Sequence, residues 1–211
     1  GRILSTHVGS LPWLDGPPAA DALPQAVAAI VAKQRELGLD LVNEGEYAKG
    51  GDWLAYTDER FGGFEGRAPD GTPPLITRGR DREAFADFYR YATEKGTLFY
   101  LPGTQIHQKR VNWVCTGPIH YRGHAAVKRE IELLLAHVPK EDAFLTCTAP
   151  ASLEVYRKNE FYPSEEAFVL AIAEAMREEY EAIAAAGVTV QVDDAWLPAL
   201  WDRIGMDMGL T

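Results

Sequence analysis

Two pairs of carboxylates follow short apolar runs in this 211-residue chain, and their types and positions are suited to chemistry. Asp193 and Asp194 come directly after the apolar run 188–192, and Glu44 and Glu46 end a second such run. In folds where strands and helices alternate, substrates bind at the C-terminal ends of the strands. The acids therefore indicate a binding or catalytic site. The alternative is that they only cap the turns that follow.

The elements that must position these acids alternate along the chain. Pro24 fits the first turn of a helix over 21–37, and Gly38 fits its left-handed stop. Residues 47–80 predict a short helix and a long irregular excursion. We expect strands or short apolar runs at 2–8, 39–46, 98–101, 111–115, 143–147 and 188–192, and further helices at 81–95, 124–137 and 164–186.

The last of these helices shows an apolar stripe at helical spacing, which predicts a core-facing side and not a cofactor site. Ser164 is placed to cap its start. The stripe consists of Phe168, Ile172, Ala175, Met176, Tyr180 and Ile183.

The alternation of strand and helix predicts an α/β fold with parallel strands. A doubly wound sheet usually carries a glycine-rich phosphate loop after its first strand, and residues 8–12 do not form one. Polar residues at successive strand ends favour a (β/α)8 TIM-type barrel instead. That fold typically needs roughly 250 residues. We therefore expect residues 1–211 to be a single, partial barrel domain with about the first five strands.

Composition excludes several classes of protein. The formal net charge of -10 leaves no basic surface to neutralise phosphates, which argues against nucleic-acid binding. No stretch approaches the roughly 20 apolar residues of a membrane helix, and the N-terminus does not have the pattern of a signal peptide. We expect a cytoplasmic protein. Cys115 and Cys147 are expected to be buried reduced thiols, although a disulfide between them stays possible on sequence alone.

Four spaced motifs resemble the catalytic domain of cobalamin-independent methionine synthase and its stand-alone relatives, which include epoxyalkane:coenzyme M transferase. The resemblance covers nearly the whole chain. The motifs are Thr6-His-Val-Gly-Ser-Leu-Pro12, Gly38-Leu-Asp-Leu-Val-Asn-Glu-Gly-Glu46, Glu178-Glu-Tyr180 and Val190-Gln-Val-Asp-Asp194.

The resemblance implies a zinc-dependent, thiol-directed methyl- or alkyltransferase. In that family zinc binds a thiol as its thiolate, which attacks a methyl group on a folate or an epoxide carbon. It further implies that Glu46 and Asp193 are the catalytic acids that hold the amino group of a homocysteine-like thiol. Gly9 and Ser10 would contact its other polar end. His7 and Trp196 complete the implied substrate-binding set, although Trp196, like Trp53 and Trp113, also suits a structural role.

The chain departs from the family in its metal ligands. The family's His-x-Cys pair, a Glu and a later Cys lie beyond the Asp193 motif, past Thr211, so the resemblance places no zinc ligand here. Three explanations would account for the missing strands and ligands. The chain is an incomplete polypeptide, a split enzyme whose missing strands come from another chain, or a truncated product that dimerises. We expect another chain or a second copy to cover the open barrel edges. Trp13 replaces the family's usual basic residue, and Ala195 replaces a common proline.

Three hypotheses follow. The first is the methionine-synthase-like transferase, with the epoxide:coenzyme M branch as a variant. The second is a catalytically silent partial barrel that acts as a binding or assembly module. The third is a magnesium-dependent hydrolase or lyase built on Glu46, Asp193 and Asp194, since oxygen ligands suit Mg²⁺.

Overall fold

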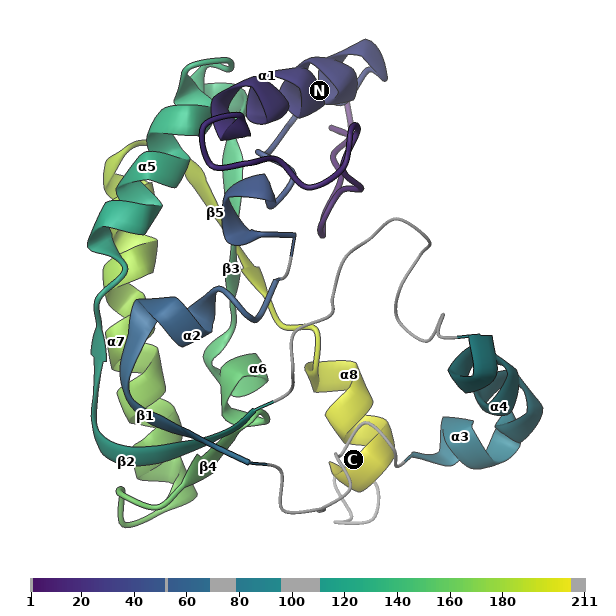
Figure 1. The fold of residues 1–211 in the computed structure, drawn as a ribbon, viewed down its shortest axis with the longest axis vertical. Helices are drawn as coiled ribbons and strands as arrows, with labels where there is room; N and C mark the ends of the chain where they lie inside the picture. Colours follow the sequence, from purple (N-terminus) through teal and green to yellow (C-terminus); the bar gives the residue numbers. More distant parts are fainter. Residues whose placement is uncertain (1, 52, 69–78, 96–110, 206–211) are drawn as a thin grey trace.

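The computed structural model describes residues 2–51, 53–68, 79–95 and 111–205. Its elements confirm an α/β protein (Figure 1). The helices are α1 (Leu23–Glu36), η1 (Tyr47–Lys49), α2 (Thr57–Arg60), α3 (Arg80–Ala84), α4 (Ala86–Lys95), α5 (His124–Leu135), η3 (Lys140–Asp142), α6 (Pro150–Glu154), α7 (Glu165–Ala185), α8 (Leu197–Leu200) and η4 (Trp201–Gly205). The strands are β1 (Phe61–Arg67), β2 (Asn112–Tyr121), β3 (Phe144–Thr148), β4 (Arg157–Asn159) and β5 (Thr189–Asp193).

The described strands form two sheets. β3 and β5 are parallel, with Thr146 opposite Gln191 and Thr148 opposite Asp193. A single parallel bridge joins Val42 to Ala143 at the start of β3. In the other sheet β2 is central, antiparallel to β1 and parallel to β4. This arrangement does not directly show a partial barrel, which stays a prediction.

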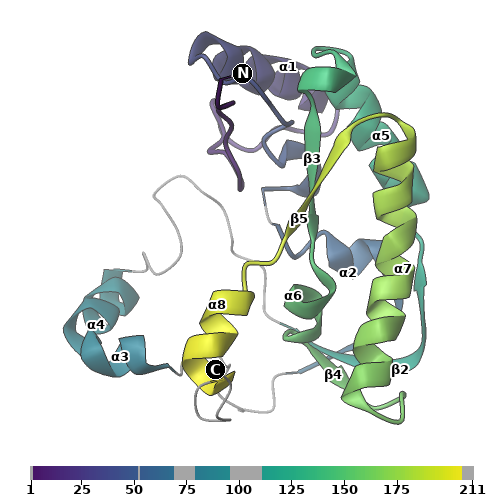
Figure 2. The same ribbon diagram turned by 180° about the vertical axis from the view of Figure 1, so that it is seen from behind.

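Three of the four expected helices are confirmed as single helices, and the expected helix at 81–95 is divided at Phe85 into α3 and α4. α5 and α7 lie side by side along one side of β3 and β5, and α1 lies near one end of α5 (Figures 1 and 2). Five of the six stripe residues of α7 are buried, and Tyr180 is partly buried. Ser164 caps α7, because its hydroxyl accepts a hydrogen bond from the Ala167 amide at 3.1 Å. α3 and α4 lie apart from the two sheets in both views.

The expected strand at 2–8 is wrong. This segment runs beside residues 39–42, and the Ser5 carbonyl accepts from the Asp40 and Leu41 amides at 3.0 and 3.1 Å. It forms no ladder, and Ile3 is 96% exposed, so little apolar burial holds it in a sheet. The expected strand at 39–46 is reduced to the bridge at Val42.

The predicted excursion at 47–80 has more order than expected. η1 and α2 confirm a short helical region, and β1 follows them as a full partner of β2. β1 was missed because three of its seven residues are glycine, a residue that sequence patterns associate with loops. Residues 69–78 and the expected apolar run 98–101 lie outside the described residues.

Candidate functional site

Glu46 occupies an unusual backbone position four residues after the Val42 bridge. Its φ is 62°, and it is the one non-glycine residue with positive φ in the described part of the chain. Such a conformation costs on the order of 1–3 kcal/mol and persists when surrounding contacts hold it. Here the Ser10 hydroxyl and the Thr146 hydroxyl, the latter at 2.9 Å, donate to the two carboxylate oxygens. Glu46 is only 1% exposed.

The segment that carries Ser10 is fixed over the Glu46 turn by backbone contacts. The Leu11 amide donates to the Gly45 carbonyl at 3.1 Å, and the Tyr47 hydroxyl donates to the Pro12 carbonyl at 2.7 Å. The sequence therefore brings Ser10 to Glu46, although the two residues are 36 positions apart.

Asp193 ends β5 and lies within electrostatic reach of Glu46. Burial, Glu46 and Asp194 raise the pKa of the half-buried Asp193 carboxyl, and Lys49 opposes the rise. Asp194 has a different role, because it accepts a hydrogen bond from the Ser152 hydroxyl at 3.1 Å and so anchors α6. The structure thus associates Ser10, Glu46 and Asp193 and turns Asp194 towards α6.

The other three expected residues, His7, Gly9 and Trp196, have contacts of their own. His7 Nε2 lies 3.0 Å from the Gly9 carbonyl oxygen, so the ring folds back on its own segment. Gly9 has a φ of 98°, which glycine adopts without strain. Trp196 is buried and packs against Tyr156, with ring centroids 5.3 Å apart. The substrate-binding roles of these three residues stay predictions.

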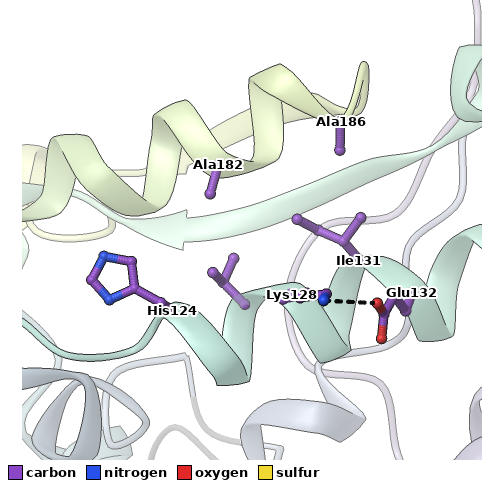
Figure 3. Close-up of a pocket in the computed structure, with 7 residues that line it drawn as sticks. His124, Lys128, Ile131, Glu132, Ala182 and Ala186 are labelled. Carbon is purple, nitrogen blue, oxygen red and sulfur yellow. Dashed lines mark ion pairs between the residues drawn. The ribbon is translucent and has the colours of Figure 1, made fainter.

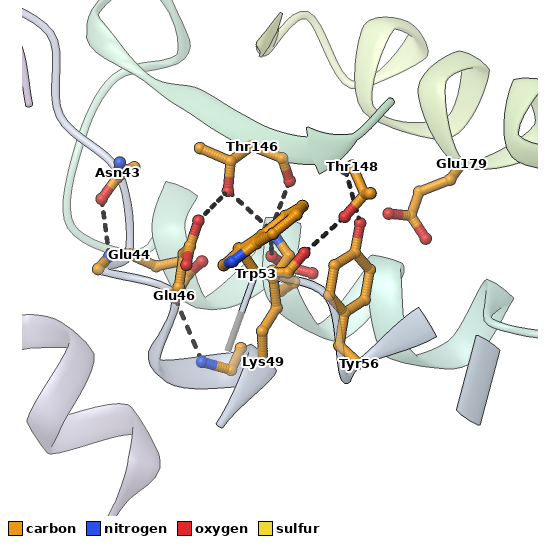
Figure 4. A network of polar contacts seen from close by, with 12 residues as sticks. Asn43, Glu44, Glu46, Lys49, Trp53, Tyr56, Thr146, Thr148 and Glu179 are labelled. Atoms are coloured by element: carbon orange, nitrogen blue, oxygen red, sulfur yellow. Dashed lines mark hydrogen bonds and ion pairs between the residues drawn. The ribbon is translucent and has the colours of Figure 1, made fainter. Parts of the chain in front are cut away.

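Sequence reasoning missed a buried ionic network behind Glu46 (Figure 4). Lys49 Nζ lies 2.8 Å from Glu130 Oε1, and Arg60 lies 2.7 Å from the other oxygen of Glu130. Arg60 also pairs with Glu179 at 3.0 Å, and the Tyr121 hydroxyl donates to Glu179 at 2.7 Å. Attraction to Lys49 and Arg60 outweighs burial and lowers the pKa of Glu130.

One signal could have revealed this network. Glu179 interrupts the apolar stripe of α7, where a solvated carboxylate would not be placed. A charge on an otherwise apolar helix face usually has a buried partner. Glu130 occupies the equivalent kind of position on α5, between buried Val127 and Leu134.

Glu44 is a fully buried acid of the site with one oxygen that has no hydrogen-bond donor among the described residues. It is 1% exposed, and the Ala48 amide donates to its Oε2 at 3.2 Å. No donor among the described residues reaches its Oε1. Burial, with repulsion from Glu130 and Glu46 outweighing Lys49, raises the pKa of Glu44 to about 8.

The described residues do not fit a zinc ion. They contain no group of three or more His, Cys, Asp or Glu side chains arranged to hold a metal, which also leaves the magnesium hypothesis unsupported there. Cys115 and Cys147 are free and buried, as expected. Burial, reinforced by Glu179, raises the pKa of Cys147 well above its usual value, so this thiol is protonated in the folded protein.

A separate hollow of about 320 Å³ lies between α5 and α7 (Figure 3). It is lined by His124, Val127, Lys128, Ile131, Glu132, Ala182 and Ala186. It shares no residue with the Glu46 site. Among the described residues, no helix is long and apolar enough to cross a membrane.

Comparison with solved structures finds a similar fold in two proteins described as B12-independent methionine synthases. The chain is similar to a putative vitamin-B12-independent methionine synthase from Listeria monocytogenes, with 22% identity, a TM-score of 0.61, and coverage of 96% of this chain and 55% of that one. It is also similar to a B12-independent methionine synthase from Shewanella sp. W3-18-1, in complex with selenomethionine. There the identity is 17%, the TM-score 0.58, and the coverage 88% of this chain and 50% of that one.

These likenesses show the fold alone, because both identities are low. The chain spans about half the length of each of these structures. No family model and no curated protein matches the sequence.

Proposed function

We propose that this chain is the amino-acid-binding part of a thiol-directed methyltransferase of the cobalamin-independent methionine synthase type. The single observation that carries the proposal is the Glu46 carboxylate, held in a left-handed turn by Ser10 and Thr146 with Asp193 close by. The similarity of fold to methionine synthases supports it.

The charges of the site favour an ammonium group as ligand. Glu46 and Asp193 come from separate elements, and Asp193 is only half-buried, so a cation would approach the pair from the side of Asp193. A bound ammonium would offset the repulsion between the two acids and would lower the pKa of Asp193. The Ser10 segment would contact the ligand's other polar end.

This charge pattern also distinguishes the two branches of the resemblance. Homocysteine carries an ammonium group, whereas coenzyme M carries a sulfonate. An acidic site repels a sulfonate and attracts an ammonium. The proposal therefore favours an amino-acid thiol, with a methyl group as the electrophile. It includes no step at a metal, because the described residues do not fit zinc.

Isothermal titration calorimetry with four ligands tests this function. We expect L-homocysteine and L-methionine to bind, and 4-(methylthio)butanoate, which lacks the amino group, and 2-mercaptoethanesulfonate to bind at least about tenfold more weakly. Glu46→Gln should abolish the preference for the amino compounds. Glu94→Gln, an exposed carboxylate on α4, is the matched control. Equal affinity for methionine and its desamino analogue, or tighter binding of the sulfonate, would overturn the proposal.

A further inference from the structure

Lys49 lies at the centre of the buried network, and all three of its ammonium hydrogens have acceptors. Its Nζ lies 2.5 Å from the Thr146 carbonyl oxygen, 3.1 Å from Thr146 Oγ1 and 2.8 Å from Glu130 Oε1. The side chain is 1% exposed. Burial lowers the pKa of Lys49, but attraction to nearby acids, chiefly Glu130, outweighs burial, so the ammonium stays charged.

The contact with Thr146 Oγ1 fixes the direction of that hydroxyl. A lysine ammonium only donates hydrogen bonds, whereas a hydroxyl has one hydrogen to donate and lone pairs to accept. Because Thr146 Oγ1 accepts from Lys49, its own hydrogen remains for another acceptor. Glu46 Oε1 lies 2.9 Å away and takes it. Such a chain of hydrogen bonds polarises each member.

We propose that Lys49 is a positioning residue, which orients the Thr146 hydroxyl as a permanent donor to Glu46 and so holds that carboxylate ready for an ammonium ligand. This inference rests on the proposed function for the identity of the ligand. Lys49 acts through Thr146 and does not touch the substrate itself.

The network also explains how Lys49 is held. Glu130 of α5 forms an ion pair with Lys49 Nζ through one carboxylate oxygen, and its other oxygen forms an ion pair with Arg60. The turn at Glu46 is therefore tied to α5 and β3 at once. A neutral residue at position 49 would no longer donate to Thr146 Oγ1, so the direction of that hydroxyl would not be fixed. It would also remove one of the two cations that pair with Glu130.

The first test needs no ligand. Proton NMR of the wild-type protein should show the Thr146 hydroxyl proton as a slowly exchanging resonance. Lys49→Met should make its exchange fast, whereas Tyr121→Phe, which removes the Tyr121–Glu179 contact elsewhere in the same network, should leave it slow. If Lys49→Met does not fold, the double variant Lys49→Met/Glu130→Gln replaces it in this test. The second substitution removes the Glu130 carboxylate, which would otherwise be buried without Lys49 as its partner. Fast exchange in the wild type, or slow exchange without Lys49, would overturn the inference.

The second test measures coupling in a double-mutant cycle. Lys49→Met should weaken L-methionine binding about tenfold and leave the desamino analogue unchanged. In a Thr146→Val background it should have no further effect, and Thr146→Ser should bind like the wild type. Additive effects, or equal losses for both ligands, would contradict a positioning role. If the wild type binds no amino acid, the proposed function fails, while the hydroxyl exchange still decides the role of Lys49.

Discussion

Glu46 keeps a backbone conformation that ordinary side chains avoid, and its two carboxylate oxygens each have a hydroxyl donor. The motifs predicted that Ser10, Glu46 and Asp193 belong to one site. Ser10 and Glu46 are joined by a hydrogen bond, and the substrate-binding role of the three residues stays a prediction. Glu44 was expected at the site beside Glu46, whereas Lys49 was not predicted. The residues on either side of Lys49, Ala48 and Gly50, are small, so nothing local indicates that the fold buries this lysine. The contacts that bury Lys49 come from α5 and β3, about 80 and 100 residues away.

Glu44 gives a pH dependence of stability whose sign can be stated. With its pKa raised to about 8, the folded protein keeps a proton that the unfolded chain releases above about pH 4. The free energy of unfolding should therefore fall as the pH rises from about 5 to 8. Glu44→Gln, which resembles the protonated form, should flatten this slope and stabilise the protein at pH 8.

Urea denaturation between pH 5 and pH 8.5 measures this effect. Glu94→Gln makes the same change at an exposed position and should keep the wild-type slope. A slope in Glu44→Gln as steep as in the wild type would mean that Glu44 is ionised in the folded protein.

At the scale of elements, helices were predicted better than strands. α1, α5 and α7 have periodic apolar faces, and the starts and stops predicted for α1 and α7 lie within about two residues of those in the structure. Strands depend on partners far away in sequence, so their patterns are weaker. β4 has three residues, Arg157–Asn159, none of them apolar, and it pairs only because β2 passes beside it. Conversely, residues 2–8 look like a strand but find no ladder.

The buried stripe of α7 predicts how this helix responds to truncation. Ile172→Ala should lower the free energy of unfolding by about 2–5 kcal/mol, because Ile172 is 0% exposed and leaves a cavity. Leu170→Ala, two residues away and 61% exposed, should change it by less than about 0.5 kcal/mol. Thermal or chemical denaturation measures both, and similar losses for the two variants would contradict this packing of α7.

The capping residue of α7 gives a second prediction at this scale. Ser164→Ala removes the acceptor for the Ala167 amide and should cost about 1 kcal/mol. Ser164→Asp restores an acceptor at the same position and should recover the loss. The same denaturation assay measures both variants. If Ser164→Asp does not recover the lost free energy of unfolding, the serine does not stabilise α7 by capping it.

At the scale of the whole molecule, β5 pairs with β3 alone among the described strands. Val192, on this strand, is 47% exposed, and an open apolar strand edge favours pairing with another chain.

The α/β class of the fold could be predicted from the alternation of strands and helices along the sequence. The division into two sheets could not, because β1 and β4 were not recognised and both complete the second sheet.

The exposed edge predicts self-association. We expect sedimentation velocity at micromolar concentration to give a mass larger than one chain. Val192→Lys, which places a charge on the edge, should shift the protein towards monomer. Leu170→Lys, at an exposed apolar position on α7, should not. A stable wild-type monomer would show that this edge needs no second copy.

The most direct test of the amino-acid site is a crystal structure of the chain with L-selenomethionine, with its selenium located by anomalous scattering. We expect one strong selenium peak beside the Ser10 segment, with the amino nitrogen within hydrogen-bonding distance of Glu46 and Asp193. The peak should be absent in Glu46→Gln crystals soaked in the same way. A selenium peak elsewhere, or an amino group turned away from both acids, would contradict the account.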